Sequence, residues 1–150
     1  MSSFANPAHR PTPAGLTIQL DESRKPLLVV TFTGVPTDED FTAYLERQTR
    51  VVLRREKNVT LIDAMGVVMV LPSQRKRQAE WQREHEPLLR TYSLGTSFAI
   101  SSPVVRGFLT AILWVQPLPH PHHVAASRAD AERWAIAQLD AAGLHTPALG

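Results

Sequence analysis

The amino-acid sequence predicts an α/β protein with a mixed, mostly parallel β-sheet and about four helices, in the order ββαβαβαβα. Two patterns support this fold class. Short runs rich in β-branched and aromatic residues, typical of buried strands, alternate along the chain with longer segments whose apolar residues recur at helical spacing. The first two strand-like runs have no helix between them, which predicts a hairpin, and the later strands are separated by helices, as in parallel sheets.

The first half of the chain contains three predicted strands and one helix. Alternating apolar and polar residues predict a half-buried strand at 16–20, and the run 27–32 predicts a more deeply buried one. Thr37, followed by three acidic residues, predicts a helix start because a hydroxyl and carboxylates satisfy the amide groups at that end. The apolar run 59–62 predicts a parallel strand that carries Asp63 at its carboxyl end.

The second half continues the alternation. Pro72 predicts the start of a helix, and Pro87 predicts a kink or break within it because proline lacks an amide hydrogen. The remaining expected elements are a strand at 97–100, a buried helix at 103–115, an edge strand at 123–126 and a last helix from Ser127 to Gly143. The helix faces that carry tryptophan are expected to pack in the core; these residues are Trp81, Trp114 and Trp134.

The composition limits the classes of function. Of 150 residues, 43% are hydrophobic and 20% charged, which suits one folded domain. We expect that domain at 16–143, with a flexible lead-in at 1–15 and a flexible tail at 144–150. No apolar run is long enough to cross a bilayer and no targeting segment is recognisable, so we expect a cytoplasmic protein without membrane insertion. The absence of Cys excludes thiolate metal sites, and a net charge of +2 is too small to predict nucleic-acid binding.

Four stretches of the chain, taken with the order of elements, carry a resemblance to a known family. They are the strand Val59-Thr60-Leu61-Ile62-Asp63, the segment Gly95–Ile100, the pair Arg106-Gly107 ahead of Trp114, and the closing helix with Ala131 and Trp134. Together they resemble the SpoIIAA-like branch of the STAS-like superfamily, over about residues 16 to 143. The resemblance implies the fold of anti-sigma-factor antagonists, which is shared more distantly by CRAL-TRIO lipid-transfer domains.

The resemblance also implies a phosphorylation site that this chain lacks in its usual form. In the antagonists, a partner kinase phosphorylates a serine that follows the central strand, and the added charge blocks docking. Here the corresponding stretch is Asp63-Ala64-Met65-Gly66, without serine. Ser73 is the only hydroxyl residue near the expected helix start, where the pattern favours an ordinary first-turn serine over a phosphorylation site.

We therefore expect a non-enzymatic regulatory domain that docks a protein partner through the loop and helix start after the central strand. The apolar run 67–71 would supply contact area and the basic residues a polar rim. Whether this run is a strand, a core loop or an exposed patch stays open. The expected partner-binding residues are Asp63, Val67, Met69, Ser73, Arg75, Lys76 and Arg77. Reversing the charge of Arg75 and Arg77 is expected to weaken docking, and a homodimer is an alternative assembly.

Two other classes of function remain open. A carrier of a small apolar ligand or lipid would need a cavity of several hundred Å³ under the helical segment 104–115, with Arg106 and Trp114 as candidate ligand residues. An enzyme would need a histidine within hydrogen-bonding reach of Asp63. Arg106 is expected either to extend into solvent or to pair with Asp63, because an unpaired buried cation is costly.

The run His120-Pro121-His122-His123 is the strongest metal-like pattern. Neutral imidazoles bind zinc, nickel and copper. However, His122 and His123 are adjacent, and adjacent side chains on an extended segment point in opposite directions. We therefore expect no metal site there, and no cofactor elsewhere.

Overall fold

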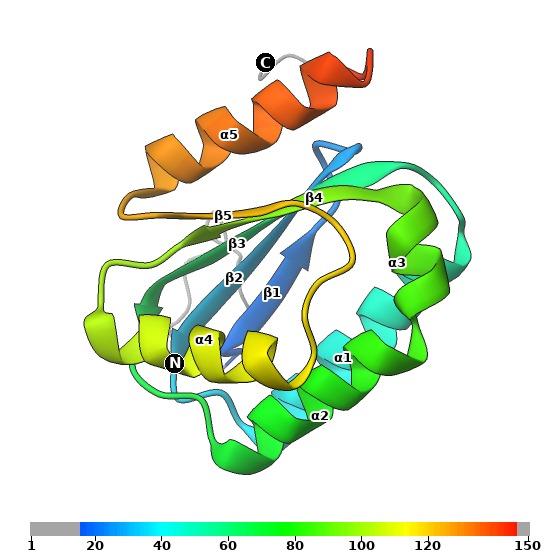
Figure 1. The fold of residues 1–150 in the computed structure, drawn as a ribbon. Coiled ribbons are helices and arrows are strands. Elements are labelled where there is room, and N and C mark those ends of the chain that lie inside the picture. Colours follow the sequence, from blue (N-terminus) through cyan, green and yellow to red (C-terminus); the bar gives the residue numbers. More distant parts are fainter. Residues whose placement is uncertain (1–15, 147–150) are drawn as a thin grey trace, which may run out of the picture.

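The computed structural model describes residues 16–146 and contains one five-stranded sheet with the order β1-β2-β3-β4-β5 (Figure 1). The expected lead-in at 1–15 and the end of the expected tail, 147–150, lie outside the described residues. Strands β1 and β2 pair antiparallel, and the other neighbours pair parallel, as predicted. The strands are β1 (Ile18–Asp21), β2 (Leu27–Gly34), β3 (Asn58–Val67), β4 (Ser93–Ala99) and β5 (His122–Ala125).

Five helices connect and cover these strands, one more than predicted. They are α1 (Asp38–Leu53), α2 (Pro72–Glu84), α3 (Glu86–Tyr92), α4 (Pro103–Val115) and α5 (Arg128–Ala141). The extra helix arises because the segment expected as one kinked helix is divided at His85, just before Glu86-Pro87. Proline is compatible with the first turn of a helix but not with its interior, which explains a break at this point.

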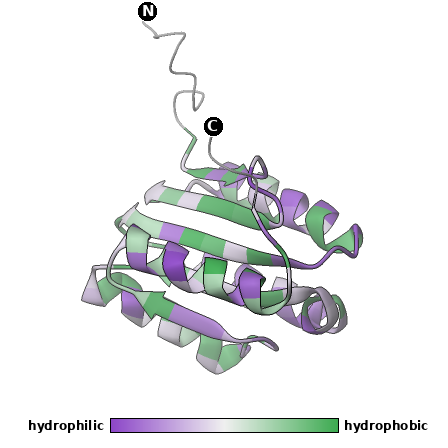
Figure 2. Ribbon diagram, turned by 90° about the horizontal axis from the view of Figure 1, so that it is seen from above, coloured by the Kyte–Doolittle hydropathy of each residue, from purple (hydrophilic) through white to green (hydrophobic). Residues whose placement is uncertain are grey.

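The sheet separates two apolar layers. Helix α5 covers one face and packs against β3, β4 and β5, while α1 to α4 lie on the other face (Figure 1). Side chains of β2 and β3 alternate between the layers: Leu27, Val29 and Leu61 pack toward α5, and Leu28 and Val30 pack toward α1. The strands under α5 are mostly hydrophobic (Figure 2). This alternation decides which side chains can meet at any site on the sheet.

The strand after α1 is longer than the sequence suggested. Strand β3 continues past Asp63 to Val67, which is buried and pairs with Gly34. Residues 68–71 form a loop that leads into α2. The run 67–71 is therefore divided between strand and loop.

Helix starts follow the predicted capping chemistry. The hydroxyl groups of Thr37, Ser102 and Ser127 each accept a hydrogen bond from the backbone N–H three residues later, at 3.0, 3.3 and 3.1 Å. These bonds satisfy amide groups that have no partner within the helix.

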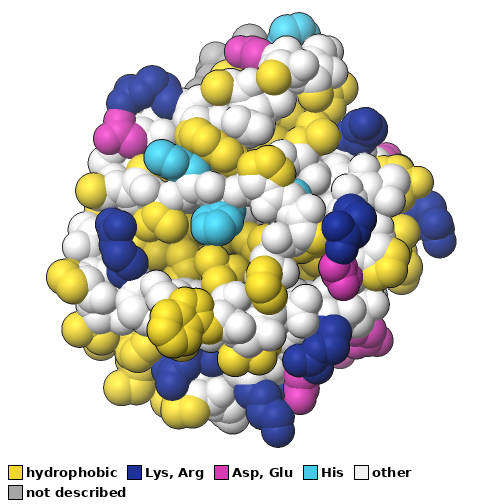
Figure 3. All heavy atoms as spheres, viewed as in Figure 1, with side chains coloured by type: hydrophobic (Ala, Val, Ile, Leu, Met, Phe, Trp, Pro, Cys, Tyr) yellow, Lys and Arg dark blue, Asp and Glu magenta, His cyan; other side chains and the backbone are white. Residues whose placement is uncertain are grey.

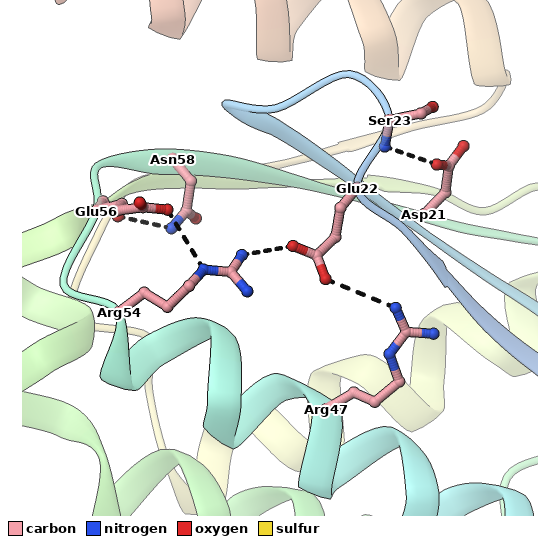
Figure 4. Close-up of polar contacts among 7 residues, drawn as sticks. All are labelled: Asp21, Glu22, Ser23, Arg47, Arg54, Glu56 and Asn58. Carbon is pink, nitrogen blue, oxygen red and sulfur yellow. Dashed lines mark hydrogen bonds and ion pairs between the residues drawn. The ribbon is translucent and has the colours of Figure 1, made fainter.

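A polar network ties the β1–β2 turn to the end of α1 (Figure 4). Glu22 pairs with Arg54 and with Arg47, and Arg54 also donates to Glu56. The Asn58 side-chain amide donates to the backbone carbonyl of Glu56 at 3.0 Å. The network lies at the amino ends of the parallel strands, so the carboxyl ends of the strands form the opposite edge of the sheet.

Candidate functional site

Asp63 lies near the carboxyl end of β3, but its side chain is fully occupied by contacts within the protein. Oδ2 accepts a hydrogen bond from Arg128 Nη1 of α5 at 3.0 Å, and Oδ1 accepts one from the Met65 backbone N–H at 3.0 Å. The second contact is the local backbone cap that the sequence allowed. Among residues 16–146, no histidine is a partner of Asp63, so the arrangement required for an enzyme of the expected kind is not formed there.

Of the two alternatives expected for Arg106, extension into solvent is confirmed and pairing with Asp63 is wrong. Arg106 is exposed on α4. Asp63 follows Leu61 with strand alternation and therefore points toward α5, on the other face of the sheet. The ion pair is made by Arg128 instead, at the start of α5. The same alternation separates Asp63 from the other expected docking residues, which belong to the side covered by α2 and α4.

The start of α2 holds two of its three expected basic residues in internal contacts. Arg75 Nη1 donates to the Val70 carbonyl at 2.6 Å, and the guanidinium lies 4.8 Å from the centre of the Phe108 ring of α4. Arg77 similarly donates to the Thr42 hydroxyl and lies over the ring of Phe41 on α1. Reversing these two charges would therefore disturb packing as well as any docking surface.

Lys76 and Ser73 remain exposed on the same helix start. Lys76 makes no hydrogen bond or ion pair with the described residues 16–146. Ser73 lies directly after Pro72, in the first turn of α2. These two side chains are thus available at the carboxyl edge, in contrast to Arg75 and Arg77.

Exposed apolar side chains gather at this edge of the sheet. Val68 is 66% exposed, Met69 42% and Val104 62%, and Val35 is exposed in the β2–α1 loop. The Val68 N–H donates to the Gly34 carbonyl at 2.8 Å, which places the loop after β3 beside the loop after β2. We call Val35, Val68, Met69 and Val104 the edge patch. The sequence analysis named Met69 and included Val68 in the run 67–71, but it did not find Val35 or Val104. Val67, which it named as a docking residue, is buried because it ends β3 in the core.

A cavity of about 140 Å³ lies between the sheet and the helices α1 to α4. Its walls are mainly apolar and include Phe98 of β4, Trp81 of α2, and Leu109 and Ile112 of α4. The volume is below the several hundred Å³ expected for a carrier. From the side shown in Figure 3, hydrophobic side chains and histidines gather between β5 and α4.

The two ligand residues expected for the carrier do not line this cavity. Arg106 is exposed, and Trp114 is 84% exposed, so the expectation that Trp114 packs in the core is also wrong. The reason is the phase of α4: Val105, Leu109 and Ile112 face the sheet, which turns Arg106 and Trp114 outward. Trp81 is buried as expected, and Trp134 is half-buried.

Polar side chains from several elements interrupt the apolar wall of the cavity, and three of them, Thr60, Thr96 and His120, lie together on β3, β4 and the segment before β5. Thr60 and Thr96 are direct neighbours on β3 and β4, and the Thr96 hydroxyl lies 2.8 Å from His120 Nε2. Burial, with a smaller effect from nearby His122, lowers the pKa of His120 to about 4. His120 is therefore a neutral imidazole near pH 7. Its Nδ1 is buried and has no hydrogen-bond partner among the described residues.

The remaining histidines of the run point apart. The ring of His122 contacts Phe98 on the cavity side, and the ring of His123 stacks on Trp134 of α5 at a centroid distance of 5.6 Å. In the described part of the chain, no three His, Asp or Glu side chains come together as a metal-binding group. No helix within residues 16–146 combines the length and apolarity needed to cross a membrane.

Neither the protein-family models nor the curated proteins include a match to this chain. Solved structures do match. An uncharacterised protein of the DUF3478 family from Shewanella loihica PV-4, described as having a SpoIIAA-like fold, matches with a TM-score of 0.60 and 14% identity, over 85% of this chain and 98% of that one. The chain has a SpoIIAA-like fold. An anti-sigma factor antagonist from Mycobacterium paratuberculosis also matches, with a TM-score of 0.54, 17% identity and coverage of 83% and 97%.

The SpoIIAA-like fold confirms the resemblance that was based on the central strand and the closing helix. Within this SpoIIAA-like frame, the loop after β3 and the start of α2 lie where the sequence analysis expected a docking surface. The loop carries Val68 and Met69, and the helix start carries Ser73 and Lys76.

Proposed function

We propose that this protein is a regulatory domain that binds a protein partner through the edge patch and the exposed start of α2. The observation that carries the proposal is the exposure of four apolar side chains, from two loops and the start of α4, at one edge of the sheet. Contiguous exposed apolar surface is typical of interaction sites on folded proteins. The similarity to an anti-sigma factor antagonist supports a regulatory role.

The proposed surface has an apolar centre and an exposed cation beside it. Val68 and Met69 lie at the centre, and Lys76 lies on the neighbouring helix turn. Apolar side chains supply most of the binding free energy in such interfaces, while charges at the rim mainly affect orientation and association rate. The complementary partner therefore presents an apolar surface with an acidic group placed to meet Lys76.

Ser73 gives this surface a site for modification. It is exposed, lies in the first turn of α2 and is close in sequence to Lys76. A phosphate there would add about −1.5 to −2 units of charge beside the apolar patch and oppose docking of an acidic partner. Asp63 is not part of the proposed surface because Arg128 and the Met65 amide occupy its oxygens.

Site-specific photo-crosslinking in cells of the source organism tests the proposal. A benzophenone amino acid would replace Val68 in one variant and Arg133, an exposed residue on α5, in a control variant. We expect one protein to be crosslinked from position 68 and not from position 133. Excess unlabelled wild-type protein should compete with this crosslink, whereas a Val68→Asp protein should not.

The competition step separates specific docking from adventitious contact. A crosslink that wild-type protein fails to reduce, or that Val68→Asp reduces equally well, would contradict the proposed surface. Circular dichroism of the Val68→Asp protein serves as the folding control, since Val68 lies in a loop and is mostly exposed.

A further inference from the structure

We propose that the cavity between the sheet and α1 to α4 binds a small, uncharged, mainly apolar molecule that carries one hydroxyl group. This inference goes beyond the proposed docking function and uses different residues. It depends on the size of the cavity, on the chemistry of its walls and on the group formed by Thr60, Thr96 and His120 among its polar side chains.

The size sets the class of ligand. A cavity of about 140 Å³ is smaller than the pockets of roughly 300–1,000 Å³ that hold drug-sized molecules. It is close to an engineered apolar cavity of about 150 Å³ that binds benzene. A single-ring aromatic molecule or a short alcohol therefore matches the available space, whereas a long-chain lipid does not.

The charge of the walls restricts the ligand further. No Lys or Arg is among the residues that line the cavity, and Glu56 is the only ionised side chain among them. His120 is neutral near pH 7. A carboxylate or phosphate group would be desolvated in this cavity without a counter-charge, which is strongly unfavourable. The ligand is therefore uncharged.

The polar side chains supply a place for one hydroxyl group. Thr60 and Thr96 project from adjacent strands into the same apolar layer, in direct register. The Thr96 hydroxyl is engaged with His120, but the Thr60 hydroxyl has no hydrogen bond to any other described residue. A ligand hydroxyl that meets Thr60 would therefore gain a hydrogen bond inside a mainly apolar wall, where such a bond is electrostatically stronger than in water.

Helix α4 leaves much of its apolar surface uncovered. Its residues are almost all apolar, yet Val105 is the only one of Pro103–Val115 that is buried. Helices in a close-packed core bury a whole apolar stripe. The incomplete cover of α4 leaves room for the cavity, and hydrophobic side chains are visible between α4 and β5 (Figure 3).

Three probes of similar size test the inference by NMR titration of the ¹⁵N-labelled full chain. Phenol carries the apolar ring and the hydroxyl, toluene lacks the hydroxyl, and benzoate carries a negative charge. We expect saturable shifts of amides near Thr60, Phe98 and Leu109 with phenol, weaker binding of toluene and no binding of benzoate. The indole N–H signal of Trp81 provides a side-chain reporter inside the cavity.

Two variants assign any binding to this cavity. Thr60→Val removes the hydroxyl with little change of shape and should weaken phenol about three- to tenfold, the effect of one hydrogen bond, while toluene is unaffected. Thr33→Val is the matched control, because Thr33 is exposed on β2 and does not line the cavity. Ala64→Leu places a larger side chain in the cavity and should abolish binding of both probes, with thermal unfolding as the check that the variant folds.

Several results would overturn the inference. They are the absence of saturable phenol shifts up to its solubility limit, benzoate binding as tightly as phenol, or equal phenol affinity in wild type and folded Ala64→Leu. A Val68→Asp protein should bind phenol like wild type, because Val68 does not line the cavity. The phenol titration therefore tests the cavity independently of the docking proposal.

Discussion

The neutral His120 predicts a loss of stability in mildly acidic solution that a single substitution should remove. Burial lowers its pKa to about 4 in the folded protein, from a usual value of 6.5. The unfolded chain therefore binds a proton at His120 between pH 6.5 and pH 4, whereas the folded protein does not. Proton binding to the unfolded state lowers the free energy of unfolding as the pH falls.

The magnitude follows from the two pKa values. The contribution of neutral His120 to the free energy of unfolding is fully present above pH 6.5, declines between pH 6.5 and pH 4, and is constant below pH 4. Integration from pH 7.5 to pH 5 gives a loss of about 2 kcal/mol from this residue alone. In His120→Gln that contribution is absent, since glutamine does not titrate.

Urea unfolding at pH 7.5 and pH 5.0 measures the effect. The difference in unfolding free energy between the two pH values should be about 2 kcal/mol larger in wild type than in His120→Gln. His122→Gln is the control and should keep most of the wild-type difference, because His122 is exposed and makes only the smaller contribution to the lowered pKa of His120. If His120→Gln shows the same pH dependence as wild type, His120 is not buried in the neutral form and the reasoning fails.

Three further substitutions test the packing around the sites. Gln74→Ala should lower the unfolding free energy by about 2–4 kcal/mol in urea, because the fully buried amide donates to the Pro36 carbonyl and its oxygen accepts from a backbone N–H of the α2 start. Gly95→Ala should lower the unfolding free energy by about 1–3 kcal/mol and change the near-ultraviolet circular dichroism, because an added Cβ would lie 2.9 Å from the ring of Trp134. An unchanged unfolding free energy would contradict this close approach. Asp40→Asn should lower the unfolding free energy by about 1 kcal/mol at pH 7, because hydrogen bonds from Thr17 lower the pKa of Asp40. The difference in unfolding free energy between variant and wild type should disappear as the pH falls below about 3.8, and a difference that persists at pH 2 would contradict this reasoning.

The fold was predictable because its signals are local. Capping hydroxyls at Thr37, Ser102 and Ser127 mark three helix starts, and the structure contains the corresponding hydrogen bonds. The strand-like runs predicted the sheet, and the helices between the later runs predicted that this part of the sheet is parallel. Pro87 predicted a kink or break in the helix that starts at Pro72, but not that the two pieces would form separate helices.

The candidate sites were less predictable because they depend on which face of an element is covered. Both Arg106 and Trp114 belong to an apolar helix, and only the packing of α4 on the sheet shows that they point outward. Asp63 was placed correctly at a strand end, but its partner depended on which helix covers that face. The neutral state of His120 comes from burial by segments far apart in sequence, so no local pattern indicates it.

The proposed docking edge and the proposed ligand cavity share a wall, which makes them physically dependent on one another. Val70 and Phe108 both line the cavity, and Arg75 joins them by donating to the Val70 carbonyl and lying over the Phe108 ring. Met69, which belongs to the edge patch, is the chain neighbour of Val70. A ligand that shifts this wall would change partner affinity, and the partner would then change ligand affinity by the same factor. An equal phenol affinity with and without bound partner would mean that the wall is rigid and the two sites are independent.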